Sequence, residues 1–372
     1  MKLGPHREGQ FYGKLNLSFQ LLFVHQGSLA MKKIFASKIL NNRINYFSDF
    51  ALKSLSTLPA IALSIVCATV QAQNFPEHPI TLVVPNPPGG FVDTSARLLS
   101  EPLARLINQP VVIDNRPGAS GNTAYQYVAR AKPDGYTLLI SYSGYHVGNP
   151  SLMDKLPWDP IKDFTPVALL TTSTNVIAVH PSVPANNLKE FIAYAKANPG
   201  KLNYASQGNG SVSHIGTEIF KQIANIDLVH VPYKGSGAAI QDVLSGQVQV
   251  FITTPPSVMQ HIQIDKLKAL AVTGKTRHPM LPNVPTTAEA GVPSFQLESW
   301  VALYAPANTP TAVVAKLTDA VKRSMELPEV KQRADTAGVD ISYLNPAALD
   351  ALLKKELPYW NKIIKSANIH LD

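Results

Sequence analysis

The fold is decided by the stretch Ile80-Thr81-Leu82-Val83-Val84-Pro85-Asn86-Pro87-Pro88-Gly89-Gly90-Phe91-Val92-Asp93. Its first five residues are almost entirely apolar, which predicts a buried strand. After the two glycines, apolar residues recur at steps of four, three, four and three, the pattern of one helix face, at Val92, Ala96, Leu99, Leu103 and Leu106. The chain therefore passes from a strand through a Pro/Gly loop directly into a helix.

The alternation of strand and helix continues along the chain. Short apolar runs predict further strands at residues 111–113, 137–141, 202–205, 228–231, 248–252, 267–272 and 298–304. Helical patterns predict a helix ending near residue 131, helices at 188–197, 212–224 and 238–244, a helix with Thr309 as N-cap and Pro310 as its first residue, and a long amphipathic helix from Pro346. This order is typical of parallel sheets covered by helices, and it restarts near residue 188. We therefore predict an α/β protein with two lobes.

Length and composition agree with two folded domains and exclude several classes of protein. The chain has 372 residues, 45% of them hydrophobic, which is enough for two cores. Its single cysteine excludes a disulfide framework and a cysteine-rich zinc site. The formal net charge of +8 is concentrated in residues 1–72, which hold eight Lys/Arg and two acidic residues. Residues 73–372 hold 25 basic and 23 acidic side chains, so we expect no nucleic-acid partner.

Residues 1–72 have the features of an export leader. Met31-Lys32-Lys33 supplies a positive start, and residues 58–70 form an uncharged, largely apolar run of 13 residues. That length suits a signal-peptide core of about 7–15 residues and is short of the about 20 that a membrane helix needs. We predict a signal peptide that starts at Met31 and is cleaved after Ala72, which directs the mature chain to the periplasm. The alternative is a short membrane anchor.

Two loops place glycines directly before a predicted helix. The first spans residues 85–93, and the second is Ser206-Gln207-Gly208-Asn209-Gly210-Ser211. Glycines let backbone N–H groups approach a ligand, and a helix start adds unpaired N–H donors and about half a positive charge. Each loop is therefore a candidate carboxylate site. The alternative is that both loops are ordinary tight turns.

Several short motifs occur in one order and together resemble a known family. They are residues 80–93, Asp114-Asn115-Arg116-Pro117-Gly118, Lys132-Pro133-Asp134-Gly135-Tyr136, Asn203-Tyr204-Ala205-Ser206 with Gly208-Asn209-Gly210, and His230-Val231-Pro232-Tyr233-Lys234-Gly235. The leader and residues 281–286 fit the same pattern. The combination resembles the periplasmic substrate-binding proteins of tripartite tricarboxylate transporters, the Bug-type receptors, over essentially all of residues 75–372.

The resemblance implies a type II periplasmic-binding-protein fold, with two lobes, a mostly parallel sheet in each, and a ligand cleft between them. Such chains cross between the lobes twice, so the expected lobes are residues 73–173 with 298–372, and residues 174–297. The cleft holds the carboxylate of a small organic anion, partly through bridging water. Many family members have an aromatic residue where this chain has Asn86. The positions that match the ligand-binding residues are Asn86, Pro87, Gly89, Gly90, Asp93, Ser143, Tyr145, Gly208, Asn209, Gly210 and Ser211.

The expected function is that of a non-catalytic receptor. It captures a mono-, di- or tricarboxylate or an acidic amino acid by lobe closure and delivers it to the membrane permease subunits of a tripartite tricarboxylate-type transporter. We expect a monomer without cofactor or bound metal. Two alternatives stay open. One is a secreted serine hydrolase that pairs Ser120 or Ser211 with His146 or His214, and the other is a sensor subunit that reports the same ligand to a signalling partner.

Some motifs and side chains have two interpretations. Gly118-Ala119-Ser120-Gly121-Asn122 lacks the final glycine of a nucleophile elbow, which weakens the hydrolase interpretation. Asp93 either places a favourable charge in the first helical turn or contacts an amino or hydroxyl group of the ligand. His214 and Glu218 have a metal-binding spacing, but without a third ligand a structural contact is expected. Lys234 is either solvated or lies in the cleft, where it attracts anions.

Overall fold

The computed structural model describes residues 75–366 and 369, which belong to one compact unit spanning Asn74–Asp372. The predicted leader, with its start at Met31 and its cleavage site after Ala72, lies outside the described residues. In the part of the chain that is described, no helix is long and apolar enough to cross a membrane.

One sheet of six strands has the order β11-β4-β10-β3-β1-β2. Strand β1 pairs in parallel with β2 and β3, whereas β10 is antiparallel to β3 and β4, and β11 is antiparallel to β4. We call this sheet and the helices packed on it the six-stranded lobe. Its strands are β1 (Ile80–Val84), β2 (Val111–Asn115), β3 (Thr137–Tyr142), β4 (Phe164–Thr174), β10 (Glu298–Pro306) and β11 (Asp340–Leu344).

A second sheet of five strands has the order β7-β6-β8-β5-β9 and defines the five-stranded lobe. Strand β6 is parallel to β7 and β8, and β5 is antiparallel to β8 and β9. Both sheets are therefore mixed: the predicted parallel pairing holds where helices connect the strands. The strands are β5 (Val176–Val179), β6 (Asn203–Ser206), β7 (Val229–Pro232), β8 (Val250–Thr253) and β9 (Lys268–Val272).

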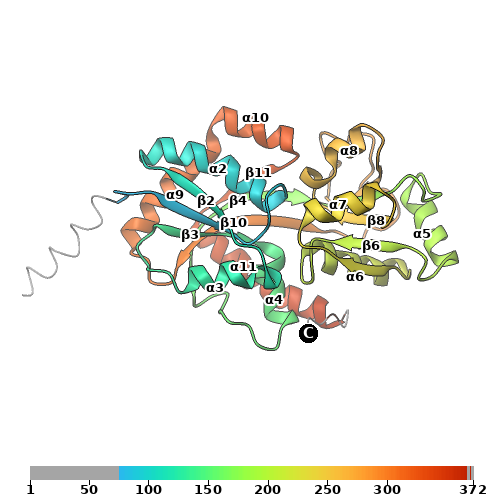
Figure 1. The fold of residues 1–372 in the computed structure, drawn as a ribbon, viewed down its shortest axis with the longest axis horizontal. Coiled ribbons are helices and arrows are strands. Elements are labelled where there is room, and N and C mark those ends of the chain that lie inside the picture. Colours follow the sequence, from blue (N-terminus) through green and yellow to red (C-terminus); the bar gives the residue numbers. More distant parts are fainter. Residues whose placement is uncertain (1–74, 367–368, 370–372) are drawn as a thin grey trace, which may run out of the picture. The chain divides into compact units, whose positions relative to one another are not determined.

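Two groups of helices cover the six-stranded sheet. Helices α2, α9 and α10 pack on one another, and α4 packs on α11; Figure 1 shows these groups on opposite faces of the sheet. Four of the five residues of the predicted apolar face of α2 are buried and Leu106 is half-buried. In α11 the buried residues are Leu349, Leu353, Trp360 and Ile364. The helices are α2 (Phe91–Ile107), η1 (Ala119–Gly121), α3 (Asn122–Ala129), α4 (Ser143–Leu152), α9 (Thr311–Glu326), α10 (Pro328–Ala337) and α11 (Pro346–Ser366).

In the five-stranded lobe, α6 and α7 both contact β6 and β8. Helix α6 begins at its predicted residue because the Ser211 side chain accepts the His214 N–H, and it ends where Asn225 adopts a left-handed conformation. Helix α5 is capped in the same way by Asn187. The helices are α5 (Leu188–Ala197), α6 (Val212–Ala224), α7 (Ser236–Leu244), η2 (Pro255–Ser257) and α8 (Met259–Gln263).

The chain passes from one sheet to the other at two points that are hydrogen-bonded together. The first crossing is Asn175, between β4 and β5, and the second is the segment between β9 and β10. Thr273 Oγ1 accepts the Asn175 N–H at 2.8 Å and donates to the Leu297 carbonyl oxygen at 2.5 Å. All three residues are buried, so the link is shielded from water. The lobe boundaries expected from the sequence stay a prediction.

Some elements differ from those predicted. The N-cap assignment of Thr309 is wrong: its hydroxyl donates to the Pro306 carbonyl oxygen at 2.8 Å, and the helix begins at Thr311 after Pro310. Strands β4, β5 and β11 and helices α4 and α10 were not predicted, although β4 and β5 each contain a short apolar run. Helix α4 contains two glycines and Pro150, residues that disfavour a helix, so its packing against α11 explains its formation better than its propensity.

Candidate functional site

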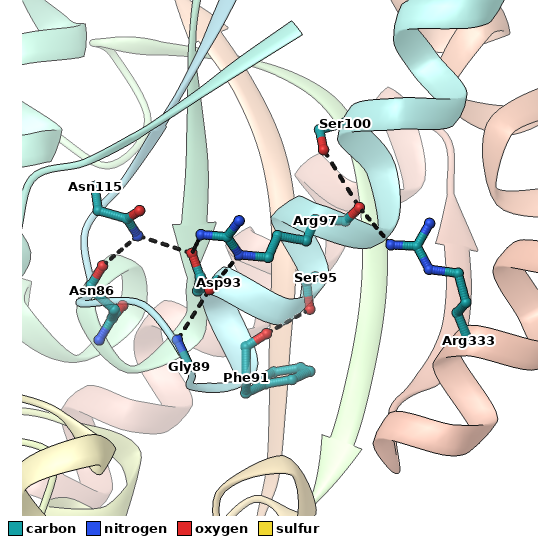
Figure 2. A network of polar contacts seen from close by, with 9 residues as sticks. All are labelled: Asn86, Gly89, Phe91, Asp93, Ser95, Arg97, Ser100, Asn115 and Arg333. Atoms are coloured by element: carbon teal, nitrogen blue, oxygen red, sulfur yellow. Dashed lines mark hydrogen bonds and ion pairs between the residues drawn. The ribbon is translucent and has the colours of Figure 1, made fainter.

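The β1–α2 loop is held in place by the carboxylate of Asp93 (Figure 2). Asp93 Oδ2 accepts the Gly89 N–H at 3.0 Å and Arg97 Nε at 2.8 Å, and Oδ1 accepts Asn115 Nδ2 at 3.1 Å. The Asn115 amide also donates to the Asn86 carbonyl oxygen at 2.9 Å. The side chain of the first helical turn thus connects the loop, the helix and strand β2.

The electrostatics of Asp93 follow from these bonds. Burial alone would raise its pKa, but the hydrogen bonds from Arg97, the Gly89 N–H and Asn115 outweigh burial, and the pKa lies below its usual value. The carboxylate is 3% exposed, while the Arg97 side chain is 53% exposed. Because its oxygens already accept from the protein, the geometry favours a structural role for Asp93, which includes holding the loop, over a ligand contact.

The β6–α6 loop is stabilised by its own serine and histidine side chains. Ser211 Oγ donates to the Gly208 carbonyl oxygen at 2.7 Å, and the Gly210 N–H donates to His214 Nδ1 at 3.2 Å. The His214 ring stacks on His230 at 4.2 Å between centroids, and His230 Nε2 is hydrogen-bonded to Ser206 Oγ at 2.7 Å.

Burial lowers the pKa of His214, and burial with the neighbouring His214 and Lys221 lowers that of His230 to about 3. Both rings are therefore neutral at neutral pH.

Loops of the two lobes approach closely at glycines. A Cβ atom added to Gly90 would lie 2.8 Å from Ser236 Oγ at the start of α7, and one added to Gly235 would lie 2.9 Å from Pro87 Cγ. A Cβ on Gly144 of α4 would lie 2.9 Å from the Val212 backbone nitrogen at the start of α6. The starts of α2, α4, α6 and α7 therefore meet where the lobes touch.

A cavity of about 460 Å³ opens between these loops. The six-stranded lobe supplies the β1–α2 loop, the segment before α3 and one tyrosine, and the five-stranded lobe supplies the β6–α6 and β7–α7 loops. Its lining is Pro85, Pro87, Pro117, Gly118, Ala119, Ser120, Gly121, Tyr145, Gln207, Gly208, Asn209, Pro232, Tyr233, Lys234 and Gly235. The residues are mostly small or proline, so the walls present much backbone.

The predicted site residues fall into three groups around this cavity. Pro87, Tyr145, Gly208 and Asn209 line it. Asn86 and Gly90 line a much smaller gap beside it, against Gln207 and Ser236, and Asn86 Oδ1 is buried without a hydrogen-bond partner in the described part of the chain. Residues Gly89, Asp93, Ser143, Gly210 and Ser211 line neither.

Four of those five residues hold the loops, and Ser143 connects α4 to β10. Gly89 donates to Asp93, and Gly210 donates to His214. Ser143, at the start of α4, accepts the Trp300 N–H from β10 at 3.1 Å and is buried inside its own lobe. The sequence thus located the loops, whereas the backbone N–H groups of the two glycines and the side chains of Asp93, Ser143 and Ser211 are bonded within the protein.

The segment Pro117–Gly121 was not among the predicted ligand-binding residues, although Ser120 was a candidate nucleophile in the hydrolase alternative. Ala119 and Ser120 have φ values of 47° and 53°, between Gly118 at 132° and Gly121 at 82°, so four consecutive residues are in a region that favours glycine. Such backbone strain is frequent at functional sites. The sequence feature that could have predicted this segment is its glycine content directly after β2. Because β2 is the parallel neighbour of β1, the loops that follow the two strands lie at the same edge of the sheet.

The geometry does not favour a serine hydrolase, because the candidate serines and histidines are not paired in the described residues. His146 is fully buried, and both ring nitrogens are bonded, Nδ1 to Ser141 Oγ at 2.7 Å and Nε2 to the Pro160 carbonyl oxygen at 2.9 Å. Within residues 75–366 and 369, no hydrogen bond joins Ser120 or Ser211 to a histidine ring. Among those residues there is also no group of three His, Cys, Asp or Glu arranged to hold a metal ion.

Comparison with known proteins identifies the family. Residues 95–369 match the family model described as "Tripartite tricarboxylate transporter family receptor". The chain belongs to this receptor family. Protein BugT of Bordetella pertussis is 33% identical over 312 residues, which cover 84% of this chain and 96% of BugT. Receptors of this family are periplasmic, and the sequence-based recognition of a Bug-type receptor is confirmed.

Solved structures of receptors agree with the fold. R. palustris Rpa4515 with adipate is 35% identical, with a TM-score of 0.77 over 80% of this chain and 99% of that one. MatC from Rhodopseudomonas palustris with bound malate is 35% identical, with a TM-score of 0.74 over 78% of this chain and 100% of that one. The receptor thus has the two-lobed type II periplasmic-binding-protein fold that the sequence predicted, with mixed sheets.

Proposed function

We propose that this receptor binds a small organic carboxylate in the 460 Å³ cavity between its lobes and delivers it to the permease subunits of a tripartite tricarboxylate-type transporter. The observation that carries the proposal is the convergence of loops from both lobes on that cavity. The solved relatives with adipate and malate support a carboxylate as the ligand. The ligand contacts we propose are Pro87, Tyr145, Gly208 and Asn209, with Asn86 and Gly90 beside them.

The cavity suits an anion because three helices begin directly after the loops that line it. Helices α3, α6 and α7 each start directly after a lining loop, at residues 122, 212 and 236. Every helix start carries unpaired N–H groups and the equivalent of about half a positive charge. Three such starts around one cavity favour a negatively charged group, and backbone donors bind it without a specific side chain.

Ligand capture is proposed to proceed by closure of the lobes. Both lobes supply lining residues, so a ligand that contacts both walls at once binds the closed state more tightly than the open one. A ligand shifts the balance between two states only by this difference in affinity. The hydrogen-bonded crossings at Asn175, Thr273 and Leu297 are the proposed hinge, because the chain connects the lobes there.

The cellular part of the proposal rests on the leader and on the family. A signal peptide starting at Met31 and cleaved after Ala72 would release the mature chain into the periplasm, where a receptor meets its permease. We propose a monomeric, non-enzymatic role there. The engagement of both ring nitrogens of His146 supports binding rather than hydrolysis.

A thermal-shift screen of the mature chain tests the function. Carboxylates of one to three acid groups are compared with their carboxamide analogues and with acidic amino acids. A true ligand at about 100 times its dissociation constant raises the unfolding free energy by about 2.7 kcal/mol, and its amide does not. Turnover of ester substrates without stabilisation by any carboxylate would instead establish the hydrolase.

A further inference from the structure

The candidate cavity has a single cationic side chain on its wall. Of the described residues that line it, Lys234 is the only Lys, Arg, Asp or Glu. Tyr145 and Tyr233 are its other ionisable lining residues, and burial raises the pKa of each phenol to about 12, with the hydrogen bond to Asp242 adding to the effect in Tyr233. Both phenols are therefore neutral at neutral pH, and the cavity has a wall charge of one positive unit.

The Lys234 ammonium is not neutralised by the protein. Lys234 is exposed, and no ion pair or hydrogen bond connects its side chain to another described residue. The acid that follows on α7, Asp242, accepts the Tyr233 hydroxyl at 2.7 Å instead. Asp93, on the other lobe, is bonded to Arg97, Asn115 and the Gly89 N–H. The positive charge therefore stays available to a ligand.

The two walls of the cavity differ in character. Lys234 lies on the five-stranded lobe, in the loop between β7 and α7. The six-stranded lobe contributes Pro85, Pro87, the segment Pro117–Gly121 and Tyr145, none of which carries a charge at neutral pH. A ligand with one carboxylate can use the backbone donors of the loops. A ligand with a second carboxylate has one charged partner to reach, and that partner is Lys234.

We infer that Lys234 binds a second carboxylate and sets a preference for dicarboxylates over monocarboxylates of the same length. The inference rests on the proposed function, since it names the ligand class of that same cavity. The ammonium of lysine is a compact charge on a flexible stem, which suits anions of differing length. Pairing with it also draws the five-stranded lobe toward a ligand held by the other lobe.

The test uses matched ligand pairs in which a methyl group replaces one carboxylate. Adipate is compared with hexanoate, and malate with 2-hydroxybutyrate, by calorimetric titration of the mature chain. We expect the wild type to bind at least one dicarboxylate at least tenfold more tightly than its partner. Lys234→Gln should lower that affinity at least tenfold and change monocarboxylate affinity less than twofold, while Lys234→Arg keeps most of the preference.

The control is Lys189→Gln, which removes an exposed lysine of the same lobe at α5, outside the cavity lining. Its affinities for adipate, hexanoate, malate and 2-hydroxybutyrate should lie within twofold of the wild-type values. A wild type that binds dicarboxylates while Lys234→Gln binds them equally well overturns the inference and leaves the receptor function standing. Equal losses for mono- and dicarboxylates in Lys234→Gln also overturn it. If the wild type binds none of the four ligands and no other carboxylate, the proposed function fails as well.

Discussion

Gly90 and Ser236 face each other across the junction of the two lobes, so closely that a Cβ atom on Gly90 would lie 2.8 Å from Ser236 Oγ. Gly90 has φ −101° and ψ −179°, an extended conformation that any residue adopts. The glycine is therefore needed for space rather than for backbone freedom. The lobes can therefore approach this closely only because residue 90 has no side chain.

Gly90→Val should weaken carboxylate binding by at least about tenfold, equivalent to about 1.4 kcal/mol. The branched side chain would meet α7 before the lobes reach the distance seen here, while the strands of each sheet stay paired. Unfolding free energy should change by less than about 1 kcal/mol, because the lobes can stay further apart and make room for the added side chain. Calorimetric titration and chemical denaturation measure the two effects.

Two further variants test whether Ser236 is the obstacle. Adding Ser236→Ala to Gly90→Val removes the facing hydroxyl and should recover part of the lost affinity. Gly237→Val places the same side chain one residue further along α7, where no atom lies within 4 Å of the added Cβ, and should bind normally. Normal binding by Gly90→Val would remove this contact from the closing mechanism.

Asp93→Asn should destabilise the protein by about 2 kcal/mol. The amide turns one acceptor oxygen into a donor that faces Arg97, Asn115 or the Gly89 N–H, and so leaves a buried donor without its partner. Arg97 is half exposed, so most of the loss comes from the loop and β2 contacts. Urea denaturation at neutral pH measures the change.

The acid dependence of this variant has a definite sign. A carboxyl whose pKa is lowered by folding stabilises the protein above its unfolded pKa of about 3.9, and that contribution is lost as the pH falls through the folded value. Asp93→Asn should therefore lose less stability than the wild type below about pH 4. The control is Asp114→Asn, whose pair with Arg116 is partly exposed and should contribute less than about 1 kcal/mol. If the stability of Asp93→Asn falls with acid pH as steeply as that of the wild type, the Asp93 carboxylate is not the stabilising group.

His146 should make the protein less stable at mildly acidic pH. Burial lowers its pKa to about 4, although the hydrogen bond to the Pro160 carbonyl oxygen acts in the opposite direction. In the unfolded chain the histidine pKa is about 6.5, so between this pH and about pH 4 His146 is protonated in the unfolded state but not in the folded state. Stability is therefore lost as the pH falls from about 6.5 to about 4, by about 3 kcal/mol from this residue.

His146→Gln checks this prediction through the slope of stability against pH. The variant loses ring packing with Tyr304 and Trp158 and should be less stable at pH 7. Its stability should nevertheless fall less steeply than that of the wild type between pH 6.5 and 4. Identical slopes in the wild type and His146→Gln would exclude His146 as the source.

Local sequence patterns were sufficient to predict the elements that frame the site. Helix α6 has the predicted bounds because Ser211 caps its start, and β1 has them because its apolar run ends at Pro85. Both glycine loops follow from these boundaries. Such patterns are local, so one sequence suffices to detect them.

Contacts between distant segments could not be predicted in the same way. Asn115 reaches Asp93 and Asn86 because β2 lies beside β1, a register that no local pattern contains. Ser143 was assigned to the cleft because it matches a cleft-lining position of the resembled family, yet its hydroxyl accepts the Trp300 N–H of β10. The Pro117–Gly121 segment lines the cavity for the same topological reason. Side-chain roles thus depended on strand order, while the positions of the loops did not.

Gly121→Ala should impair the site through Tyr145, which lines the same cavity. Gly121 has φ 82°, and an added Cβ would lie 2.4 Å from the Tyr145 ring, so the ring must move. The left-handed backbone alone costs about 1–2 kcal/mol for alanine, and Gly291→Ala isolates that cost, because its φ is 90° and no atom lies within 4 Å of the added Cβ. Both variants should lose this stability, but Gly121→Ala alone should lose carboxylate affinity, by at least about tenfold in calorimetric titration. Equal affinities in the two variants would mean that the position of Tyr145 does not matter to the ligand.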